Sequence, residues 1–432
     1  MRGIKKVIFA VLFGVGVSGI IYTISQTTGY RYFLRLQNSI DDSHFIHWKK
    51  KELAEDEIVV IDIDDASLSA LGNFKRWPRR HFGTVINRAN EDGARMVFLD
   101  VILLQGGLRQ DNDRLTDSVK DAGNVILGYY FRLDSKSRNK RPLDPVYNEK
   151  FAMNWFNTQR IEKNEFILAG AVNLPFPELV RSAAGMGFTN YIPDPDGVLR
   201  HIPLYIAYNH SLFPSAALQM WLHLRGLTQA KAEISPRGAR IDGCFIPTDK
   251  HSFIRLNFRS SGLTHTTLSF ADVLRGRFPR GSFQNKIVMI GSSSSELGDL
   301  KIVPGHNALP GVEIHAAALS TLLSEKHLTL VSGNTVFLLT LLCGVIVSLL
   351  FAFYSPFLVG VPAALAAPLA LYIYSVYCFV FHSELLNISI PSVSVLFIGV
   401  VLIIHHFIEC HAAQEKSEPG EDENNPADGI QQ

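Results

Sequence analysis

The sequence predicts a soluble α/β domain with a largely parallel sheet and an antiparallel addition, together with four transmembrane α-helices. Three observations lead to this prediction. Short β-branched runs alternate with helical patterns through the middle of the chain, which indicates a parallel sheet with right-handed crossovers. Four runs of 18 or more residues lack Asp, Glu, Lys and Arg, and each is long enough to cross a bilayer. One Asp-Gly turn lies between two strand-like runs, which predicts the antiparallel addition.

The first predicted strand is the apolar run from Ile58 to Ile61, which leads into Asp62 and Asp64. β-Branched residues bounded by acidic and turn residues are typical of a buried parallel strand. Because side chains alternate along a strand, Asp62 and Asp64 are expected to share one face near its carboxyl end. Ligands usually bind at that end in open α/β sheets. Further buried strands are predicted at residues 94–104, 124–131 and 286–291.

Helical patterns and stop signals predict the elements between and after these strands. The predicted helices are residues 79–90, 111–122, 215–225, 269–278 and 309–323, with a polar helical entry at residues 41–51. The turn PDPDG at residues 193–197 predicts a hairpin within residues 188–209. Residues 243–258 alternate like another strand pair, and the basic residues 135–162 are expected to form a long loop.

Charge segregation predicts the membrane topology. No Lys or Arg occurs between Lys326 and Lys416, and the basic residues Arg2, Lys5 and Lys6 precede the first apolar run. A basic start favours a cytoplasmic amino terminus. A cleaved signal peptide is the alternative, but no small-residue cleavage site follows the run. The prediction is a cytoplasmic segment 1–6, spans 7–24, 335–353, 357–381 and 388–408, an extracytoplasmic domain 30–326 between the first two spans, and an acidic, disordered cytoplasmic tail 409–432.

Composition narrows the class of protein. The net charge of +1 gives no sign of nucleic-acid binding, and the four cysteines form no metal-binding or CxxC pattern. No cofactor is therefore expected. The expected partners are a lipid bilayer around the apolar spans and a small ligand or envelope component at the soluble domain.

Six polar residues at predicted strand ends are candidate ligand-binding residues: Asp62, Asp64, Asp100, Ser292, Ser293 and Asp299. The carboxylates could coordinate a hard cation or accept hydrogen bonds from a polar ligand. The alternative is that they cap the helices that follow. The Gly/Ser loop at residues 291–295 could hold an anion through its amides. It matches neither the G-x-S-x-G elbow nor a P-loop.

Neither a metal site nor a catalytic site is expected. His306, Glu313 and His315 have metal-binding side chains, as does Asp299, but their spacing matches no defined motif. A polar loop entering a helix explains them as well. No nucleophile–base pair is found, so no catalytic residue is assigned. In the apolar carboxyl-terminal region, Glu384 and Glu409 lie near the ends of predicted spans. A transport function is therefore only a minor hypothesis.

Several stretches along the domain resemble a known family. They are IVVIDIDDASLSALG at 58–72 with WPR at 77–79, ARMVFLDVIL at 94–103 with DND at 111–113, FTN at 188–190 with DPDGVLR at 194–200, KIVMIGSSSSELGD at 286–299, and LPGVEIHAAALSTLL at 309–323. The chain resembles the second type of CHASE domain, over about residues 30–323. That resemblance implies a non-catalytic sensor outside the bacterial cytoplasmic membrane, and it names no ligand.

The expected function is a periplasmic sensor that binds an unknown ligand and signals through its carboxyl-terminal helices. Family receptors usually continue into an output domain, whereas this sequence ends about two dozen residues after the last span. The signal is therefore expected to pass to a partner protein or across a homodimer. The alternative is a structural or assembly protein of the cell envelope whose domain binds constitutively.

Overall fold

The computed structural model describes residues 2–48, 56–133, 166–209, 211–227, 232–235, 238–258, 265–324 and 327–415. The predicted loop at 135–162 and the tail beyond residue 415 lie outside the described residues. The chain divides into two compact units. Residues 1–40 and 330–432 form the first, called here the helical unit, and residues 41–329 form the second, called the sheet unit.

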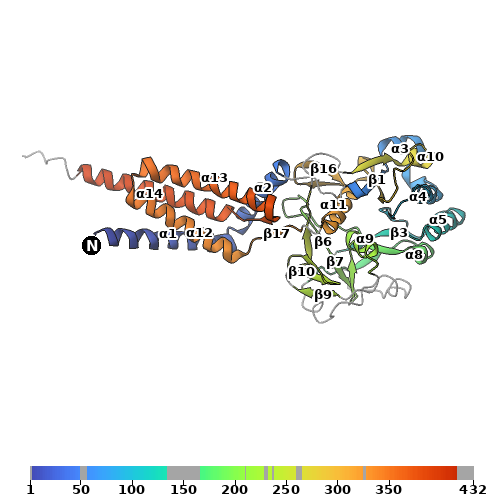
Figure 1. The fold of residues 1–432 in the computed structure, drawn as a ribbon, viewed down its shortest axis with the longest axis horizontal. Coiled ribbons are helices and arrows are strands. Elements are labelled where there is room, and N and C mark those ends of the chain that lie inside the picture. Colours follow the sequence, from blue (N-terminus) through green and yellow to red (C-terminus); the bar gives the residue numbers. More distant parts are fainter. Residues whose placement is uncertain are drawn as a thin grey trace, which may run out of the picture. The chain divides into compact units, whose positions relative to one another are not determined.

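A seven-stranded sheet organises the sheet unit, with strand order β13-β1-β14-β2-β3-β4 and with β5 also paired to β3 (Figure 1). All its pairings are parallel except that of β3 with β4. The predicted mixed, mostly parallel sheet is thus confirmed. Its strands are β1 (Ile58–Asp62), β2 (Met96–Leu99), β3 (Val125–Arg132), β4 (Ala171–Asn173), β5 (Gly185–Phe188), β13 (Thr266–Ser269) and β14 (Ile287–Gly291).

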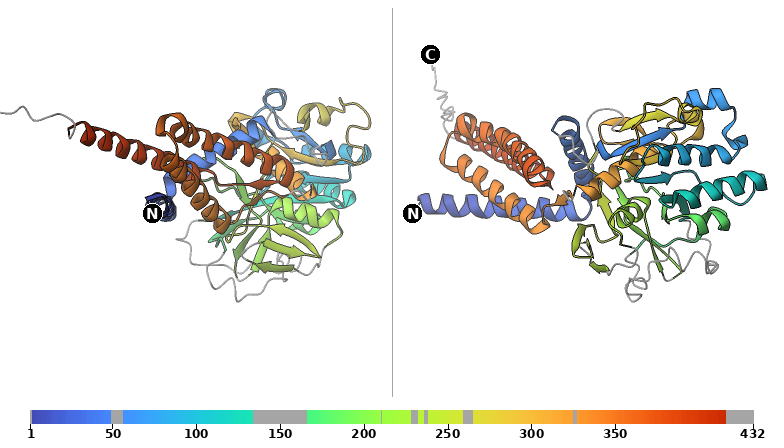
Figure 2. Two further views of the ribbon diagram at one scale, coloured as in Figure 1. Left: turned by 60° about the vertical axis from the view of Figure 1, so that its left-hand side comes forward. Right: turned by 45° about the vertical axis from the view of Figure 1, so that its right-hand side comes forward.

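Helices cover both faces of this sheet (Figures 1 and 2). One face packs α3 (Asp65–Leu71), α4 (Arg80–Glu91), α5 (Arg109–Ala122), α8 (Pro177–Ser182) and α10 (Phe270–Arg275), and the other packs α9 (Ala216–Leu224) and α11 (Gly311–Leu323). Alternate strand residues such as Val59, Ile61 and Ile290 enter one large buried apolar cluster with α4 and α5. Burial on both faces explains why the strands read as continuous apolar runs.

Smaller antiparallel pairs complete the sheet unit. They are β6 (His201–Pro203) with β12 (Phe253–Arg255), β7 (Tyr205–Tyr208) with β8 (Ser211–Pro214), β10 (Gly238–Ile241) between β9 (Ala232–Ser235) and β11 (Cys244–Pro247), and β15 (Leu300–Val303) with β16 (His306–Pro310). The 3₁₀ turns η2 (Phe74–Arg76) and η3 (Ser295–Leu297) lie in loops.

Three strand predictions were wrong in detail. The strand predicted at 94–104 ends at Leu99, and the chain then leaves the sheet at Asp100. The turn at 193–197 forms, with the Asp194 N–H donating to Val198 O at 3.0 Å. The runs beside it do not pair with each other, because β5 joins β3 and β6 joins β12. The strands within 243–258 likewise pair elsewhere, β11 with β10 and β12 with β6.

Within its described residues, the helical unit contains four helices long and apolar enough to cross a membrane: Ile4–Gln26, Gly333–Phe353, Pro356–His382 and Ser389–Gln414. They belong to α1 (Arg2–Gln26), α12 (Gly333–Phe353), α13 (Val361–Tyr377) with the π-helical ends η4 (Pro356–Gly360) and η5 (Cys378–His382), and α14 (Ser389–Glu415).

Small residues allow close packing inside the helical unit. A Cβ on Gly14 of α1 would lie 2.8 Å from Gly344 O of α12. The hydroxyls of Ser18 and Ser394 are 3.0 Å apart in the buried interior. Such small-residue contacts and hydroxyl hydrogen bonds are what hold helices together in lipid, where the hydrophobic effect does not.

Helix α2 (Tyr30–His47) begins well before the predicted helical entry at residue 41. Its residues up to Ile40 belong to the helical unit, and those from Asp41 belong to the sheet unit. One continuous helix therefore contributes residues to both units.

Candidate functional site

A pocket of about 480 Å³ opens where the parallel strands of the sheet unit end. Asp100 follows β2, Ser292 follows β14, and Thr189, Asn190 and Tyr191 follow β5. Tyr130 comes from β3, Phe74 from η2, and Asp299 from the loop before β15. The volume is in the usual range for small-molecule sites. The carboxyl edge of an open parallel sheet is also where such sites occur.

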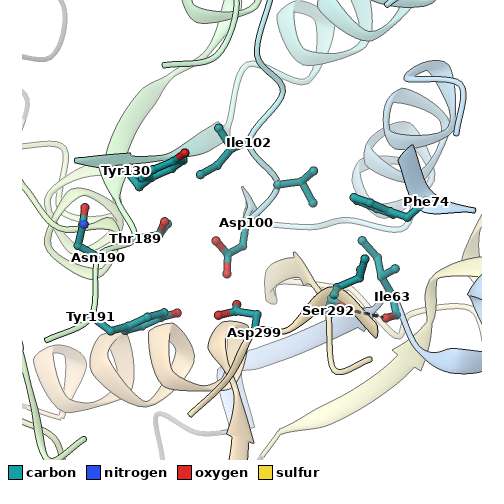
Figure 3. Close-up of a pocket in the computed structure, with 12 residues that line it drawn as sticks. Ile63, Phe74, Asp100, Ile102, Tyr130, Thr189, Asn190, Tyr191, Ser292 and Asp299 are labelled. Carbon is teal, nitrogen blue, oxygen red and sulfur yellow. Dashed lines mark hydrogen bonds between the residues drawn. The ribbon is translucent and has the colours of Figure 1, made fainter. Parts of the chain in front are cut away.

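Asp100 is the most unusual residue of this pocket. Its side chain is 9% exposed and its carboxylate points into the pocket (Figure 3). Within the described part of the chain no group donates a hydrogen bond to this carboxylate. The imidazole Nε2 of His315 lies 3.9 Å from Asp100 Oδ2, which is too far for a hydrogen bond. Burial raises the pKa of Asp100 well above its ordinary value, and the Asp299 charge raises it further while Lys301 opposes the shift. A buried carboxyl without partners is costly to ionise.

Asp299 faces Asp100 across the pocket (Figure 3). Its Oδ1 is 3.0 Å from the Lys301 ammonium, and its backbone oxygen accepts from the Gly311 N–H at 2.9 Å. A Cβ on Gly311 would collide with the Asp299 carboxylate, so the glycine is needed for this approach. Burial raises the pKa of Asp299, and the hydrogen bond and charge of Lys301 counteract that shift.

Tyr191 lines the pocket beside the two carboxylates, and His315 packs against it. Their rings stack with centroids 5.0 Å apart, and the Tyr191 hydroxyl donates to Gly311 O at 2.8 Å. Burial lowers the pKa of His315 to about 3. The imidazole is therefore neutral at pH 7, and its contact with Asp100 is not an ion pair.

Three other polar side chains that line the pocket are already engaged in hydrogen bonds. The Ser292 hydroxyl donates to Ile63 O at 2.9 Å. Asn190 forms two 2.8 Å hydrogen bonds with the backbone of Phe131, and the Thr189 hydroxyl donates to Tyr129 O at 3.3 Å. These side chains shape the pocket, whereas the carboxylate of Asp100 retains its capacity to bind.

The structure separates the six candidate residues into two groups. Asp100, Ser292 and Asp299 line the pocket. Asp62 instead accepts from the Ser293 N–H at 2.7 Å and from the Ser293 hydroxyl. The Asp62 carboxylate thus accepts a hydrogen bond from an amide of the loop at residues 291–295. This is the loop predicted as a possible anion-binding site. Burial raises the pKa of Asp62, although both Ser293 hydrogen bonds lower it.

Asp64 has the capping role that was the alternative prediction. Its carboxylate accepts from the Ser67 N–H at 2.7 Å, at the N-cap of α3. It also accepts from the Ser269 hydroxyl at 3.0 Å. The chain leaves the sheet after Asp62 and enters α3 at Asp65, so the two aspartates do not share a strand face.

Sequence reasoning missed the aromatic side of the pocket, namely Phe74, Tyr130 and Tyr191. The only sequence signal was the position of Tyr191 directly after the FTN stretch. The metal-capable residues also separate: Glu313 Oε2 lies 2.6 Å from His265 Nδ1, while His315 lies beside Asp100. Across the described ranges, no three His, Cys, Asp or Glu residues are grouped to hold a metal ion.

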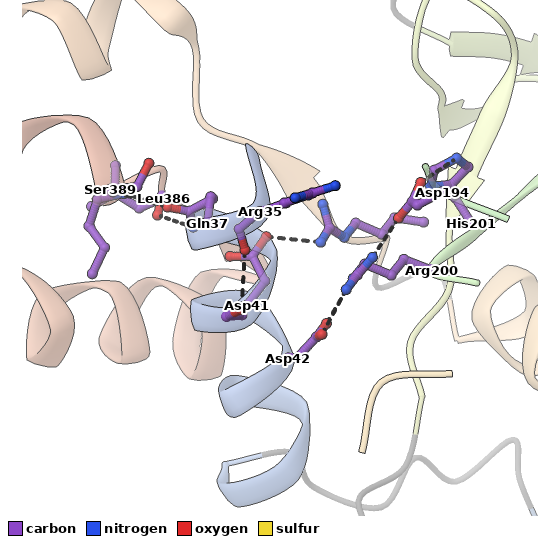
Figure 4. Close-up of polar contacts among 12 residues, drawn as sticks. Arg35, Gln37, Asp41, Asp42, Asp194, Arg200, His201, Leu386 and Ser389 are labelled. Atoms are coloured by element: carbon purple, nitrogen blue, oxygen red, sulfur yellow. Dashed lines mark hydrogen bonds and ion pairs between the residues drawn. The ribbon is translucent and has the colours of Figure 1, made fainter. Parts of the chain in front are cut away.

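A second polar cluster, also missed, lies on α2 in the sheet unit (Figure 4). Arg200 is 3% exposed, and its Nε and Nη2 each donate to the Asp42 carboxylate at 2.8 Å. Its Nη1 lies 2.8 Å from Asp194 and 3.0 Å from Asp196. These carboxylates raise the pKa of Arg200 against the effect of burial. Next to this cluster, Arg255 Nη2 donates to Asp41 Oδ2 at 2.9 Å.

Comparison with known proteins gives the family of this chain. Searches of curated proteins and of solved structures give no match. A family model described as CHASE2 domain matches residues 10–350, which is most of the chain. CHASE2 domains are extracytoplasmic sensors, and the four membrane-capable helices agree with that family. The chain is thus a membrane protein that belongs to the CHASE2 domain family.

Proposed function

We propose that this protein is a multi-pass receptor of the bacterial inner membrane whose sheet unit senses a small ligand in the periplasm. In this proposal the periplasmic domain covers about residues 30–326, and the first six residues and residues 409–432 face the cytoplasm. Asp100 is the observation that carries the proposal. A carboxylate that is nine-tenths buried, without a hydrogen-bond donor in the described chain and directed into a pocket is unfavourable unless a ligand offsets it.

A continuous set of contacts supports transmission from this pocket to α2. Lys301, paired with Asp299, belongs to β15, and the next residue, Ile302, accepts a 2.7 Å hydrogen bond from the Leu199 N–H. Leu199 precedes Arg200, which binds Asp42 on α2. A ligand that moves Asp299 therefore acts on β15, and β15 is tied to the arginine that fixes α2.

Helix α2 is held in the helical unit by equally specific contacts (Figure 4). Gln37 Nε2 donates to Leu386 O at 3.2 Å, and Gln37 Oε1 accepts from the Ile388 and Ser389 N–H groups at 3.0 and 3.1 Å. Those residues lead into α14. In our proposal the ligand shifts the population between two arrangements of α2, and the apolar helices pass this change to a partner protein or across a homodimer.

Ligand binding is tested on the full chain in lipid nanodiscs with a panel of small metabolites. All four tryptophans lie between residues 41 and 329, so tryptophan fluorescence reports unfolding of the sheet unit. A ligand at 100 times its Kd stabilises the folded state by about 2.7 kcal/mol. We expect at least one compound to raise the melting temperature, and Asp100→Asn to abolish the rise. Asp113→Asn is the matched control, because that aspartate is exposed on α5. A panel without any effect, together with stable co-purification of an envelope component, would favour the structural alternative.

Transmission needs a separate readout. Cys410 is exposed on α14, and a spin label there, with the other three cysteines replaced, reports the helical unit. An active compound should change the spectrum of this label. In Asp42→Asn the spectral change should disappear while the thermal shift remains. If both survive, α2 does not carry the signal.

Topology is tested in intact cells with a membrane-impermeant maleimide. A cysteine placed by Asp113→Cys should react from outside. Cys410 should react only after the inner membrane is permeabilised. The reverse pattern would invert the proposed orientation.

A further inference from the structure

We propose that the pocket beside Asp100 binds a small organic cation, with an ammonium group placed between the two carboxylates and the aromatic rings. This inference rests on the proposed sensor function and specifies the chemical class of its ligand. It follows from the charge, the remaining hydrogen-bonding capacity and the aromatic surface of the pocket.

The charge of the pocket is unbalanced. Asp100 and Asp299 face one another, and within the described residues Lys301 is the cation that contacts them, at 3.0 Å from Asp299 Oδ1. One ammonium thus stands beside two carboxyl groups, and ionising the second is unfavourable unless another positive charge is present. A second positive charge would compensate Asp100, whose own surroundings disfavour its ionised form through burial and the neighbouring Asp299 charge.

Most of the hydrogen-bond donors that line the pocket are already used, whereas the Asp100 carboxylate, an acceptor, is not. The hydroxyls of Thr189, Ser292 and Tyr191 each already donate to a backbone oxygen. The Asn190 amide is likewise committed to the Phe131 backbone. An anionic ligand would meet two carboxylates, and of the hydroxyls that line the pocket only that of Tyr130 is not engaged within the described chain. A cation meets neither obstacle.

Lys301 shows that this site already accommodates a positive charge. Its ammonium lies 3.0 Å from Asp299 Oδ1 and 5.4 Å from the centroid of the Tyr191 ring. A carboxylate combined with an aromatic face is the usual environment for an ammonium group. On the Asp100 side, Tyr130 and Phe74 supply further aromatic surface (Figure 3). Tyr130 is 37% exposed, so a ligand can reach it from solvent.

The test compares two compounds of the same shape that differ in charge. Choline is the cation, and 3,3-dimethylbutan-1-ol is its uncharged carbon analogue. Binding to the full chain in nanodiscs is measured by calorimetry and by the thermal shift, with tetramethylammonium, ethanolamine and putrescine as further cations. We expect at least one cation to bind, with its uncharged analogue at least tenfold weaker.

Variants locate the cation. Asp100→Asn keeps the shape of the side chain and removes its charge, and it should weaken the cation at least tenfold. Tyr130→Leu keeps an apolar surface and removes the aromatic face, which should weaken binding by about 2–5-fold. Asp113→Asn should leave binding unchanged. The melting temperature of each variant without ligand confirms that it is folded, and Tyr130→Leu serves if Asp100→Asn does not fold.

Each other outcome has a defined meaning. If neutral or anionic compounds of the metabolite panel bind in this pocket and none of the cations does, the cation class is wrong and the sensor function stands. If Mg²⁺ or Ca²⁺ alone produces the shift and Asp100→Asn abolishes it, the site is a metal site and the inference also fails. If no compound of any charge has an effect, both the inference and the proposed function fail.

Discussion

Asp100 Oδ2 lies 3.9 Å from His315 Nε2, and the two side chains are 9% and 2% exposed. Despite this proximity the pair is not stabilised as an ion pair. Burial raises the pKa of Asp100 and lowers the pKa of His315 to about 3, so each environment favours the neutral form. Two ionisable groups without mutual charge compensation reduce the stability of the empty protein, and the effect depends on pH.

Asp100→Asn should raise the stability of the empty protein at neutral pH. The variant removes a carboxyl that is costly to ionise in the folded state and keeps its shape. We expect the melting temperature to rise by ~2–4 °C, which corresponds to roughly 1 kcal/mol for a domain of this size.

The pH dependence of that gain has a definite sign. The folded-state pKa of Asp100 lies above the unfolded value of about 3.9. Between these two pKa values the folded state binds more protons than the unfolded state. Wild-type stability therefore falls as the pH rises from the unfolded to the folded pKa. The advantage of Asp100→Asn should shrink as pH is lowered toward about 4. Melting curves of both proteins from pH 4 to 8 test this, and an advantage that grows on acidification would contradict it.

His315→Phe should make the sheet unit less sensitive to acid. Both ring nitrogens of His315 lack a hydrogen-bond partner in the described chain, so phenylalanine keeps the stacking on Tyr191 without losing a hydrogen bond. In wild type the folded pKa of about 3 lies below the unfolded value near 6.5. The folded protein then loses stability as pH falls from about 6.5, by roughly 1 kcal/mol for each pH unit.

The measurement is urea unfolding followed by tryptophan fluorescence at pH 7, 6 and 5. The difference in unfolding free energy between variant and wild type should increase toward low pH. Using the difference removes the contribution of His44, whose pKa burial also lowers, to about 4. Parallel curves for the two proteins would show that His315 does not titrate as stated.

The fold was largely predictable because local signals coincide with buried strands. Val59 and Ile61 lie in a β-branched run, and burial on both faces of a parallel sheet requires such a run. Pairing between distant segments was not predictable. β6 contacts β12 rather than the strand nearest in sequence, because no local pattern specifies the partner of a short strand.

The site was predictable only in part for the same reason. Asp100 and Asp299 could be proposed because carboxyl ends of parallel strands meet at one edge. Tyr130 and Tyr191 lie about 60 positions apart in the sequence, and the parallel pairing of β3 with β5 brings their segments together. Tyr130 carries no signal of its own, and the signal for Tyr191 is only its position after the FTN stretch. The sequence pattern gives Asp64 and Asp62 the same role at the end of a strand. In the structure α3 begins directly after Asp64, which is therefore its N-cap.

Arg200→Ala should destabilise the sheet unit strongly. The arginine is almost fully buried and contacts three carboxylates, which the variant leaves without their cation. Breaking a buried pair from one side costs about 3–5 kcal/mol. Arg277→Ala removes an exposed pair with Asp272 and should cost about 1 kcal/mol or less. Urea unfolding of both variants tests the difference, and similar losses would remove Arg200 from the role proposed for it.

Gly14→Leu should disrupt the helical unit, whereas Gly16→Leu should not. A Cβ at Gly14 meets the backbone of α12, with Gly344 O at 2.8 Å, while a Cβ at Gly16 has no atom within 4 Å. Close approach through small residues is a main source of helix association in lipid. A thiol-reactive fluorophore reports this unit through the buried Cys378 as it becomes accessible on heating. Gly14→Leu should lower that transition, and equal transitions for the two variants would show that α1 and α12 do not pack in this way.

The affinity for a cation should increase with pH if the ligand sits beside Asp100. The empty pocket favours the protonated carboxyl, and a bound cation favours the carboxylate, so binding releases a proton. The groups around this carboxyl are Asp299, Lys301, His315 and Tyr191. His315 and Tyr191 have pKa values shifted away from neutrality, to about 3 and well above 10, so they do not change charge between pH 5 and 8. Asp299 has a raised pKa and adds to the same trend.

Calorimetry of choline binding in buffers of different ionisation enthalpy gives the number of protons released. Asp100→Asn should reduce that number, and a proton count unchanged by this substitution would place the cation elsewhere.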